Sequence, residues 1–475
     1  PTGASSRFEA RSASARMALV GREEEIDLIL RRWRSAADGD GRVVVLSGES
    51  GIGKSHISAE VESRIASEPH KALTFYCSPH HANSALFPFI GELERSAKFE
   101  HGDAPEQRIV KLAAIVAEEA PHSEHAMALL GSLLSLPTGS SHPLPPLTPQ
   151  QQKEATLGLL VDRLVGLAGQ KPLLIVFEDA HWADPTSLEL LARLVERIPG
   201  HRILLLISAR PEFKAPWPNE AHVSTVPLTR LSRGDAEAIV KRVLGGRKLP
   251  EEVLNQILAR TDGVPLFIEE LTKTILESGQ LEDKGEQYVL SRPFRDLTIP
   301  TTLHASLMAR LDRLASAREV AQVGAVIGRE FTFELLSAVA EMSRNVLEQL
   351  LRQVGDSGLI LQRGVVPQSV YSFKHALVRD TAYSGLLKSR RTQLHAALAR
   401  VLENQFPEIV DGQPEILAHH FSEAGLNESA VRYWLQAGRK AAVRSANMEA
   451  VAHLQSGLDR IPDLPPGASR DRLEL

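Results

Sequence analysis

The stretch that decides the fold is RVVVLSGESGIGKS, residues 42–55. It begins as an apolar run of strand length, and a glycine-rich turn follows directly. Gly48, Gly53, Lys54 and Ser55 satisfy the pattern G-x-x-x-x-G-K-[ST], which between a strand and a helix is a phosphate-binding P-loop. Glycine is needed there because backbone N–H groups must converge on phosphate oxygens without side chains in the way. The stretch therefore predicts a nucleotide-binding α/β domain.

Each residue type in this loop suits one task. The Lys54 ammonium supplies a point charge to the β- and γ-phosphates, and the Ser55 hydroxyl binds Mg²⁺. The helix that follows presents its positive N-terminal end to the phosphates. The predicted cofactors are ATP or ADP with Mg²⁺. The residues expected to contact the nucleotide here are Gly48, Glu49, Ser50, Gly51, Ile52, Gly53, Lys54, Ser55 and His56.

A second strand end predicts the catalytic half of the site. In the run LLIVFEDAHWAD, an apolar segment predicted to be a buried strand ends at Glu178 and Asp179. These two carboxylates are placed to hold Mg²⁺ and to orient an attacking water. Position favours Glu178 for the metal and Asp179 for the water, although each could share the other's role. Arg210 ends the next apolar run, RILLLISAR, where it can point at the γ-phosphate. The expected catalytic residues are Asp179, Glu178 and Arg210, and the expected metal ligands are Ser55, Glu178 and Asp179.

Apolar runs alternate with helical patterns over residues 18–226, which is typical of a parallel sheet covered on both faces. A Pro/Gly/Ser-rich stretch, SLPTGSSHPLPPLTPQ, must be loop. Short helices follow the sheet, and Ser232 is placed to cap the first of them. The five expected strands are residues 42–47, 72–77, 173–177, 202–208 and 222–228.

Further along, four helical segments, two short strands (359–364 and 370–374) and another helix form a winged-helix pattern, and amphipathic helix follows. We therefore expect a multidomain chain, in which a five-stranded α/β P-loop NTPase precedes helical domains. The expected domains are a linker (1–17), the P-loop NTPase domain (18–228), a helical lid domain (229–295), a winged-helix domain (296–388) and a tetratricopeptide-like domain (389–475).

The last domain is predicted from a spacing of about 34 residues. With Trp434 at the fourth position of a repeat, the other positions fall on Gly438, Ala450, Leu454, Gly457 and Pro462. Because stacked repeats need three or more members to bury a core, we expect the array to continue beyond Leu475. The chain opens on Pro1 without a methionine, which also suggests a piece of a longer protein.

Composition narrows the class of protein. Hydrophobic residues make up 43% and charged residues 24% of the chain, which is ordinary globular composition. The net charge of −5 is modest, so no overall electrostatic field favours nucleic acid or an anionic membrane as a partner. The lone Cys77 rules out an intrachain disulfide framework and a cysteine zinc site, so a reducing cytoplasm is expected. The apolar runs are too short to span a bilayer. The adjacent pairs His80–His81 and His419–His420 lack a third ligand at a useful spacing, so no zinc site is predicted.

Several longer stretches accompany the P-loop: LVGREEEIDLIL, EDAHWADPTSLELL, ISAR and DGVPLFIEEL. Together they resemble the STAND class of signal-transduction ATPases, relatives of AAA and origin-recognition ATPases. Two more, CSPHHANSALFPFIGELERSAKF and FKHALVRDTAYSGLL, resemble the ATPase region behind the class III adenylate/guanylate cyclase domain of bacterial fusion proteins. The resemblance runs from about Arg7 to Pro462, and SRFEA resembles the linker behind such a cyclase.

The resemblance implies further site residues. Val20, Gly21 and Arg22 would lie against the adenine, and Pro265 of the motif GVP would close over the base. His375 would reach the phosphates from the winged helix. The same resemblance makes Glu178 and Asp179 the Walker B pair and Arg210 a sensor. Many relatives carry Asp-Asp at these positions. Because this chain has Glu178, the resemblance does not decide whether Glu178 or Asp179 binds the metal and which orients the water.

The favoured hypothesis is an ATP-driven switch that regulates an attached output domain, a cyclase upstream of this chain. Cyclase activity within the chain is not expected, because no segment has the strand pattern of that core. The alternative is an ATP-dependent transcriptional regulator, but SRNVLEQLLRQVGDSG offers two arginines against two acidic residues, whereas a DNA-reading helix should be net basic. A nucleotide-binding scaffold without turnover is the third possibility. We expect slow hydrolysis, a protein or peptide partner for the C-terminal helices, no direct nucleic-acid partner and no membrane contact.

Overall fold

The computed structural model describes residues 19–464 and 470, except 101, 120–124, 138–141, 145, 219 and 292–299. The predicted linker lies outside the described residues. The chain divides into two compact units, and each is described by itself. The P-loop unit comprises 19–27, Ser47–Ser63 and Pro227–Arg391, and the sheet unit comprises Leu28–Leu46, Arg64–Val226 and the chain from Thr392 onward. These units group the chain differently from the predicted domain boundaries, which remain predictions.

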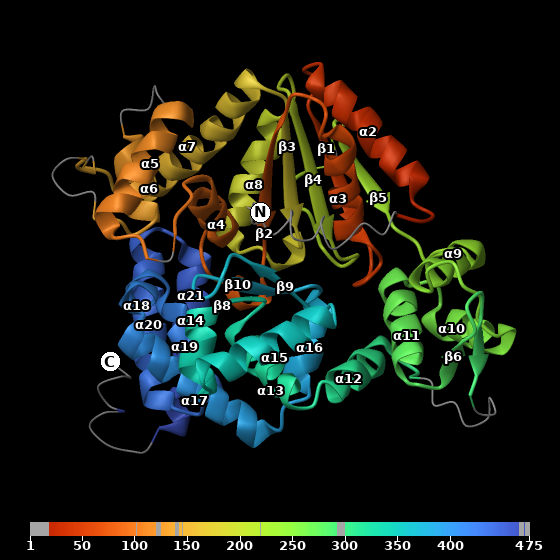
Figure 1. Ribbon diagram of the computed structural model, residues 1–475. Coiled ribbons are helices and arrows are strands. Elements are labelled where there is room, and N and C mark those ends of the chain that lie inside the picture. Colours follow the sequence, from red (N-terminus) through yellow and green to blue (C-terminus); the bar gives the residue numbers. More distant parts are fainter. Residues whose placement is uncertain are drawn as a thin grey trace. The chain divides into compact units, whose positions relative to one another are not determined.

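The sheet unit is built on five strands in the order β2-β3-β4-β1-β5 (Figure 1). Every residue of β3 and β4 is buried, as expected for strands covered on both faces. The parallel pairing of β3 with β4 sets Phe177 beside Ile207. All five predicted strands are confirmed. They are β1 (Arg42–Ser47), β2 (Lys71–Tyr76), β3 (Leu173–Glu178), β4 (Ile203–Ala209) and β5 (Val223–Pro227).

Helices before, between and after these strands bury the apolar faces of the sheet. One buried arginine joins three of them: Arg163 of α7 binds Glu92 of α4 at 2.6 Å and Glu119 of α5 at 2.5 Å. Loss of one partner from such a buried group leaves an uncompensated charge, which costs about 3–5 kcal/mol. The helices are α2 (Glu23–Ala37), which begins in the P-loop unit, α4 (Phe87–Ser96), α5 (Pro105–Glu119), α6 (Ala126–Leu133), α7 (Pro149–Gln170) and α8 (Pro185–Arg197), with the short turns η1 (Pro79–His81) and η3 (Ala180–Trp182).

The helical pair predicted from the repeat spacing is present at the C-terminal end of the sheet unit. A Cβ added at Gly438 would lie 2.6 Å from Cγ of Leu454, and one at Gly457 would lie 3.2 Å from Cβ of Trp434. Glycine at these positions therefore allows α20 and α21 to approach closely. The C-terminal elements are α17 (Lys388–Gln405), which begins in the P-loop unit, α18 (Pro407–Gly412), α19 (Pro414–Glu423), α20 (Asn427–Val443), α21 (Asn447–Leu458) and η5 (Ile461–Asp463).

The P-loop unit contains the helix after the P-loop and the helices that follow the sheet in sequence. The Ser232 hydroxyl accepts a hydrogen bond from the Asp235 N–H, so the predicted cap is confirmed. The helices are α3 (Lys54–Ile65), α9 (Arg233–Val243), α10 (Glu251–Thr261), α11 (Pro265–Glu277), α12 (Leu303–Arg313), α13 (Ser316–Ile327), α14 (Phe333–Ala340), α15 (Arg344–Asp356) and α16 (Ala376–Ser384).

The two short strands expected after these helices are present as β9 (Ile360–Arg363) and β10 (Val370–Phe373). A third strand, β8 (Glu330–Thr332), pairs antiparallel with β10 and was not predicted. The hairpin of β6 (Leu281–Asp283) and β7 (Tyr288–Leu290) was missed as well. Strands of three residues are too short to show an alternating pattern in sequence.

Candidate nucleotide-binding site

The P-loop has the backbone that its glycines predict. Gly51 and Gly53 have φ of +81° and +106°, a region that residues with a Cβ rarely adopt. A Cβ on Gly48 would lie 2.8 Å from Cγ2 of Ile52, and one on Gly51 would lie 3.1 Å from Cβ of Leu266. The three positions therefore require glycine for conformation or for space.

The Lys54 side chain is buried in this loop. Its Nζ donates hydrogen bonds to the carbonyl oxygens of Gly48 at 2.6 Å and Glu49 at 2.9 Å. Ser55 follows in the first turn of α3, so its hydroxyl and the positive end of the helix lie together at the P-loop. The chemistry of this donor set fits a phosphate group, and the Ser55 oxygen is a ligand type that Mg²⁺ accepts.

The segment predicted to lie against adenine is fixed beside the loop. The buried Arg22 guanidinium donates to the Thr229 carbonyl at 2.5 Å and to the Ile52 carbonyl at 3.4 Å. Gly21 has φ of +65°, and a Cβ there would lie 2.5 Å from the Asp235 carboxyl carbon. Arg22 thus links its own segment to the P-loop and to the chain entering α9. Val20 is half-buried.

The start of α11 touches the P-loop directly. Pro265 is the first residue of α11, and the Leu266 N–H donates to the Gly51 carbonyl at 3.2 Å. Beside this contact the exposed Arg230 lies 3.3 Å from a carboxylate oxygen of Glu49. The P-loop backbone at Gly51 is therefore in direct contact with the first turn of α11.

His375 lies beside the residue that follows the P-loop serine. The imidazole rings of His375 and His56 meet edge to face, with centroids 6.3 Å apart and planes at 80°. His375 is the N-cap residue of α16 and makes no side-chain cap bond. The sequence prediction that His375 lies near the P-loop is therefore consistent with the geometry, and contact with a phosphate remains a prediction.

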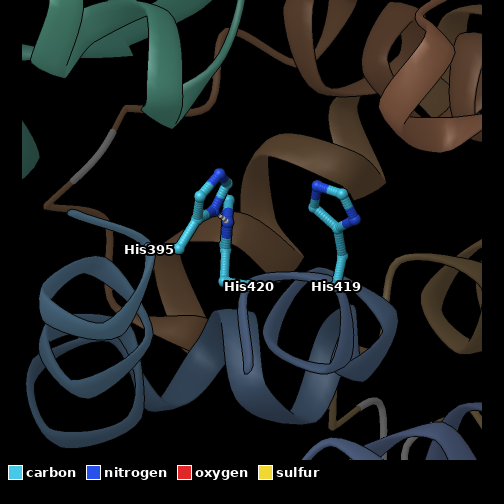
Figure 2. A group of neighbouring side chains, drawn as sticks. All are labelled: His395, His419 and His420. Atoms are coloured by element: carbon cyan, nitrogen blue, oxygen red, sulfur yellow. Dashed lines mark hydrogen bonds between the residues drawn. The ribbon is translucent and has the colours of Figure 1, made fainter. Parts of the chain in front are cut away.

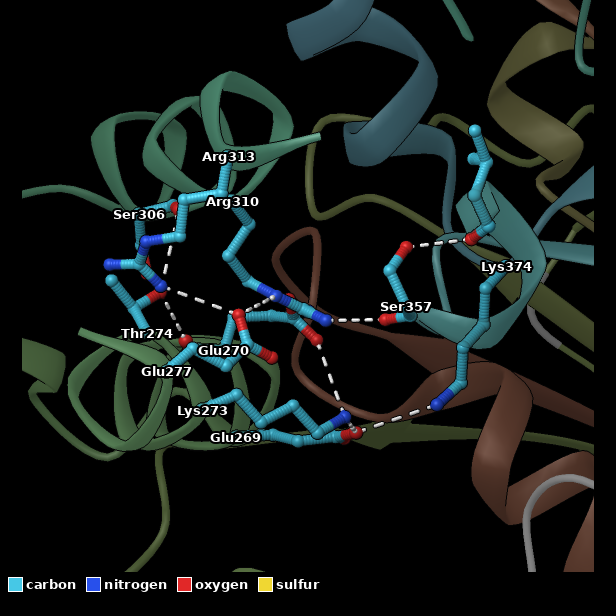
Figure 3. A network of polar contacts seen from close by, with 11 residues as sticks. Glu269, Glu270, Lys273, Thr274, Glu277, Ser306, Arg310, Arg313, Ser357 and Lys374 are labelled. Atoms are coloured by element: carbon cyan, nitrogen blue, oxygen red, sulfur yellow. Dashed lines mark hydrogen bonds and ion pairs between the residues drawn. The ribbon is translucent and has the colours of Figure 1, made fainter. Parts of the chain in front are cut away.

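A charged network links α11 to the end of β10, one residue before His375 (Figure 3). The Glu269 carboxylate is paired with the ammonium of Lys273 and lies 3.4 Å from that of Lys374. Burial alone would raise the pKa of Glu269, but the two lysines lower it to about 2. The residue is therefore a fully charged carboxylate at neutral pH.

The same network reaches α12 and the loop after α15. The buried Arg310 guanidinium is paired with Glu270 and donates to the Ser357 carbonyl at 2.5 Å, as Figure 3 shows. On the same helices the hydroxyls of Thr274 and Ser306 are 2.7 Å apart. Helix α11 is thus in contact with the P-loop at its first turn and is bound by ion pairs to the following helical region.

The carboxylate half of the predicted site lies in the sheet unit. Glu178 is the buried last residue of β3, and Asp179 follows in the left-handed region with φ of +60°, which aspartate tolerates better than most residues. The Asp179 N–H donates to the Ser208 hydroxyl of β4 at 3.0 Å. Arg210 follows β4, and its guanidinium lies 5.5 Å from the Trp182 ring centroid. The structure thus brings the three predicted catalytic residues to adjoining ends of β3 and β4.

The sequence analysis missed several residues that contact the predicted site in the structure. Leu266, Thr229, Glu269 and Lys374 contact predicted site residues or their neighbours. Leu266, Glu269 and Lys374 lie in the stretches that carry the resemblance, but none of the four was given a role in the site. The reasoning on histidines was wrong in one respect: the structure brings His395 to His419 and His420 as a third potential ligand. The spacing of 25 residues between helices gave no signal for this contact.

Comparison with known proteins identifies an AAA ATPase domain in residues 18–207 and a family described as a domain of unknown function (DUF8739) in 232–283. An uncharacterized protein of Rhizobium meliloti (strain 1021) is 27% identical over 465 residues. The match covers 96% of this chain but 44% of that protein, so the chain spans about half the length of this relative.

Two solved structures are similar at 14% identity. One is a STAND protein with a tetratricopeptide repeat sensor from Pyrococcus horikoshii, with a TM-score of 0.43 over 94% of this chain and 65% of that chain. The other is Drosophila ORC bound to DNA, with a TM-score of 0.31 over 81% of this chain and 93% of that chain. The chain contains an AAA ATPase domain on a five-stranded parallel sheet, followed by helical regions.

Proposed function

We propose that this chain is an ATP-binding and ATP-hydrolysing switch of the STAND type, in which Mg²⁺-ATP at the P-loop controls the helical regions that follow. The observation that carries this proposal is the double contact of the P-loop within its own unit. Gly51 is hydrogen-bonded to the first turn of α11, and His56 faces His375 at the start of α16. Binding or hydrolysis of the nucleotide at the P-loop would therefore alter the surroundings of both α11 and α16.

Binding would use the backbone amides of residues 48–53, with Lys54 at the β- and γ-phosphates and Ser55 at the metal ion. Mg²⁺ would bridge phosphate oxygens and neutralise charge as the bond to the γ-phosphate breaks. Glu178 and Asp179 would complete the metal site and orient the attacking water, and Arg210 would contact the γ-phosphate. Carboxylates at the carboxyl end of β3 suit this role because ligands of parallel sheets bind at that edge.

In the proposed switch, the charged network around Glu269 would carry a conformational change from α11 to the start of α16. Glu269 on α11 is paired with Lys374, the residue before His375. This ion pair would couple α11 to the start of α16. A contact made by His375 with the β-phosphate would favour one arrangement of these helices, because a ligand shifts an equilibrium only by binding its two states differently. The winged-helix domain predicted at residues 296–388 would then close on ADP.

The output domain would be a class III nucleotide cyclase attached upstream, and the C-terminal helices would bind a protein or peptide that supplies the input. Helix α21 offers exposed apolar side chains for such a partner, among them Met448, Val451 and Leu458.

The transcriptional alternative is disfavoured by α15, the candidate recognition helix. Arg344 is paired with Glu348, and Arg352 donates to the Glu348 carbonyl. A cytoplasmic location is part of the proposal, because the lone Cys77 suits a reducing compartment. Among the described residues, we find no helix with the length and hydropathy of a membrane span.

Nucleotide titration tests the proposal. Fluorescent ATP should bind the wild-type chain in the presence of Mg²⁺, and Lys54→Ala should abolish binding while the exposed control Lys171→Ala leaves it unchanged. Asp179→Ala should retain binding and lose turnover. Equal affinities for the wild type and Lys54→Ala would refute the proposed site, and full turnover by Asp179→Ala would refute the proposed catalytic role.

A further inference from the structure

Five histidines from three separate stretches gather in the sheet unit. His80 and His81 lie on η1, His395 lies on α17, and His419 and His420 lie on α19. The ring centroids of His80 and His419 are 5.6 Å apart, and those of His395 and His419 are 5.8 Å apart. None of these residues belongs to the predicted nucleotide site.

Three of the five have the geometry of metal ligands. One ring nitrogen from each of His395, His419 and His420 lies within 4.8 Å of those of the other two. Figure 2 shows the three imidazoles rising from α17 and α19 toward the same side. The Nδ1 atoms of His395 and His420 are 2.8 Å apart, so one nitrogen donates a hydrogen and the other presents its lone pair.

Two of the three imidazoles are buried, and the third is half-buried. His395 and His420 are 1% and 5% exposed. Neutral imidazole is the form that binds metal ions, because the lone pair must be available.

We propose that His395, His419 and His420 together bind one divalent transition-metal ion, with Zn²⁺ as the expected metal. An all-nitrogen ligand set selects zinc and its neighbours over Mg²⁺ and Ca²⁺, which prefer oxygen. Three imidazoles with a fourth open position are a common tetrahedral zinc arrangement. The site is therefore distinct in chemistry from the proposed Mg²⁺ site at the P-loop.

Metal entry requires the ligand nitrogens to move. Zinc–nitrogen bonds of about 2.0–2.1 Å place tetrahedral ligands roughly 3.3 Å apart. Nitrogens that are 2.8 Å apart must therefore separate by about half an ångström, and any pair at the 4.8 Å limit must approach by about 1.5 Å. His80 is the nearest additional imidazole for the fourth position, since its ring neighbours that of His419. His81 instead stacks on Phe87, with ring centroids 3.7 Å apart.

Such an ion would connect segments far apart in the chain. Its ligands come from α17 and α19, and His80 follows β2 of the sheet. Because the ion binds the folded arrangement and not the unfolded chain, zinc should raise the unfolding temperature in a concentration-dependent manner. The inference does not depend on nucleotide binding.

The experiment uses the whole chain, stripped with a chelator and free of nucleotide. Zn²⁺ is titrated in competition with a chromogenic chelator, and Co²⁺ is added separately to read the ligand-field absorption of a tetrahedral nitrogen site. The wild type should bind one equivalent. Removing even an outer-shell partner costs 10–100-fold in affinity, so His419→Gln and His395→Ala should each weaken binding by more than about 100-fold. The exposed His125→Ala is the matched control and should bind as the wild type does.

Circular dichroism verifies that each variant is folded. The half-buried His419 gives the variant least disruptive to packing, so its result decides the matter if His395→Ala does not fold. The proposal is overturned if the wild type binds neither Zn²⁺ nor Co²⁺, or if folded His419→Gln binds zinc with wild-type affinity. In either case the histidines serve packing alone.

Discussion

The charged contact between α11 and the residue before His375 can be tested by substituting Glu269 with glutamine. Glu269 is 4% exposed and lies between Lys273 and Lys374. Although burial opposes it, the lysines lower the pKa of this carboxyl from 4.5 to about 2. Each pKa unit corresponds to about 1.4 kcal/mol. The lowered pKa therefore means that the charged form of Glu269 stabilises the folded chain by about 3 kcal/mol at neutral pH.

The sign of the pH dependence follows from this lowered pKa. The stabilisation is complete above the unfolded pKa of 4.5 and is lost as pH falls toward the folded value of about 2. Chemical denaturation should therefore show Glu269→Gln less stable than the wild type by about 3 kcal/mol at pH 7, a difference that shrinks by about 1 kcal/mol at pH 4. The exposed control Glu286→Gln should stay within about 0.5 kcal/mol at both pH values. A difference that is absent at pH 7, or that grows on acidification, would refute the reasoning.

Three other predictions concern rate, packing and partner binding. Intrinsic ATP hydrolysis by the isolated chain should be slow, because no arginine finger is evident in the sequence and such a group supplies about 10³–10⁵ in rate; rapid multiple turnover in a phosphate-release assay contradicts this. Gly324→Ala should destabilise the chain by about 1–3 kcal/mol, since its Cβ would lie 2.6 Å from the Phe331 ring; an unchanged denaturation midpoint would show that the ring relaxes freely. Val451→Ser, at a position 65% exposed on α21, should leave nucleotide affinity unchanged and weaken binding of the protein or peptide partner proposed for the C-terminal helices; loss of nucleotide binding would place α21 in the structural core.

Sequence patterns predicted the sheet because its strands are long apolar runs bounded by turn signals. The P-loop was predictable for a different reason: phosphate binding demands glycine at fixed positions, and Gly51 and Gly53 have the positive φ that this requires. The close approach of α20 and α21 likewise depends on Gly438 and Gly457, which the repeat spacing marked.

Contacts between distant side chains gave no such signal. The pairing of Glu269 with Lys374 spans 105 residues, and each partner alone reads as an ordinary surface charge. His395 lies within an amphipathic helix whose pattern predicts only a buried face, yet it meets His420 of α19. Sequence periodicity predicts which face of a helix is buried, but not which side chains of another helix it meets.

The central claim is that His375 distinguishes the nucleotide states of the P-loop. The most direct test is the affinity for ADP and for ATP, measured by calorimetry on the wild type and on His375→Ala. If His375 contacts the β-phosphate in a closed, ADP-bound form, the substitution should weaken ADP more than ATP and shift the chain toward its open form. Equal changes in both affinities would contradict the claim.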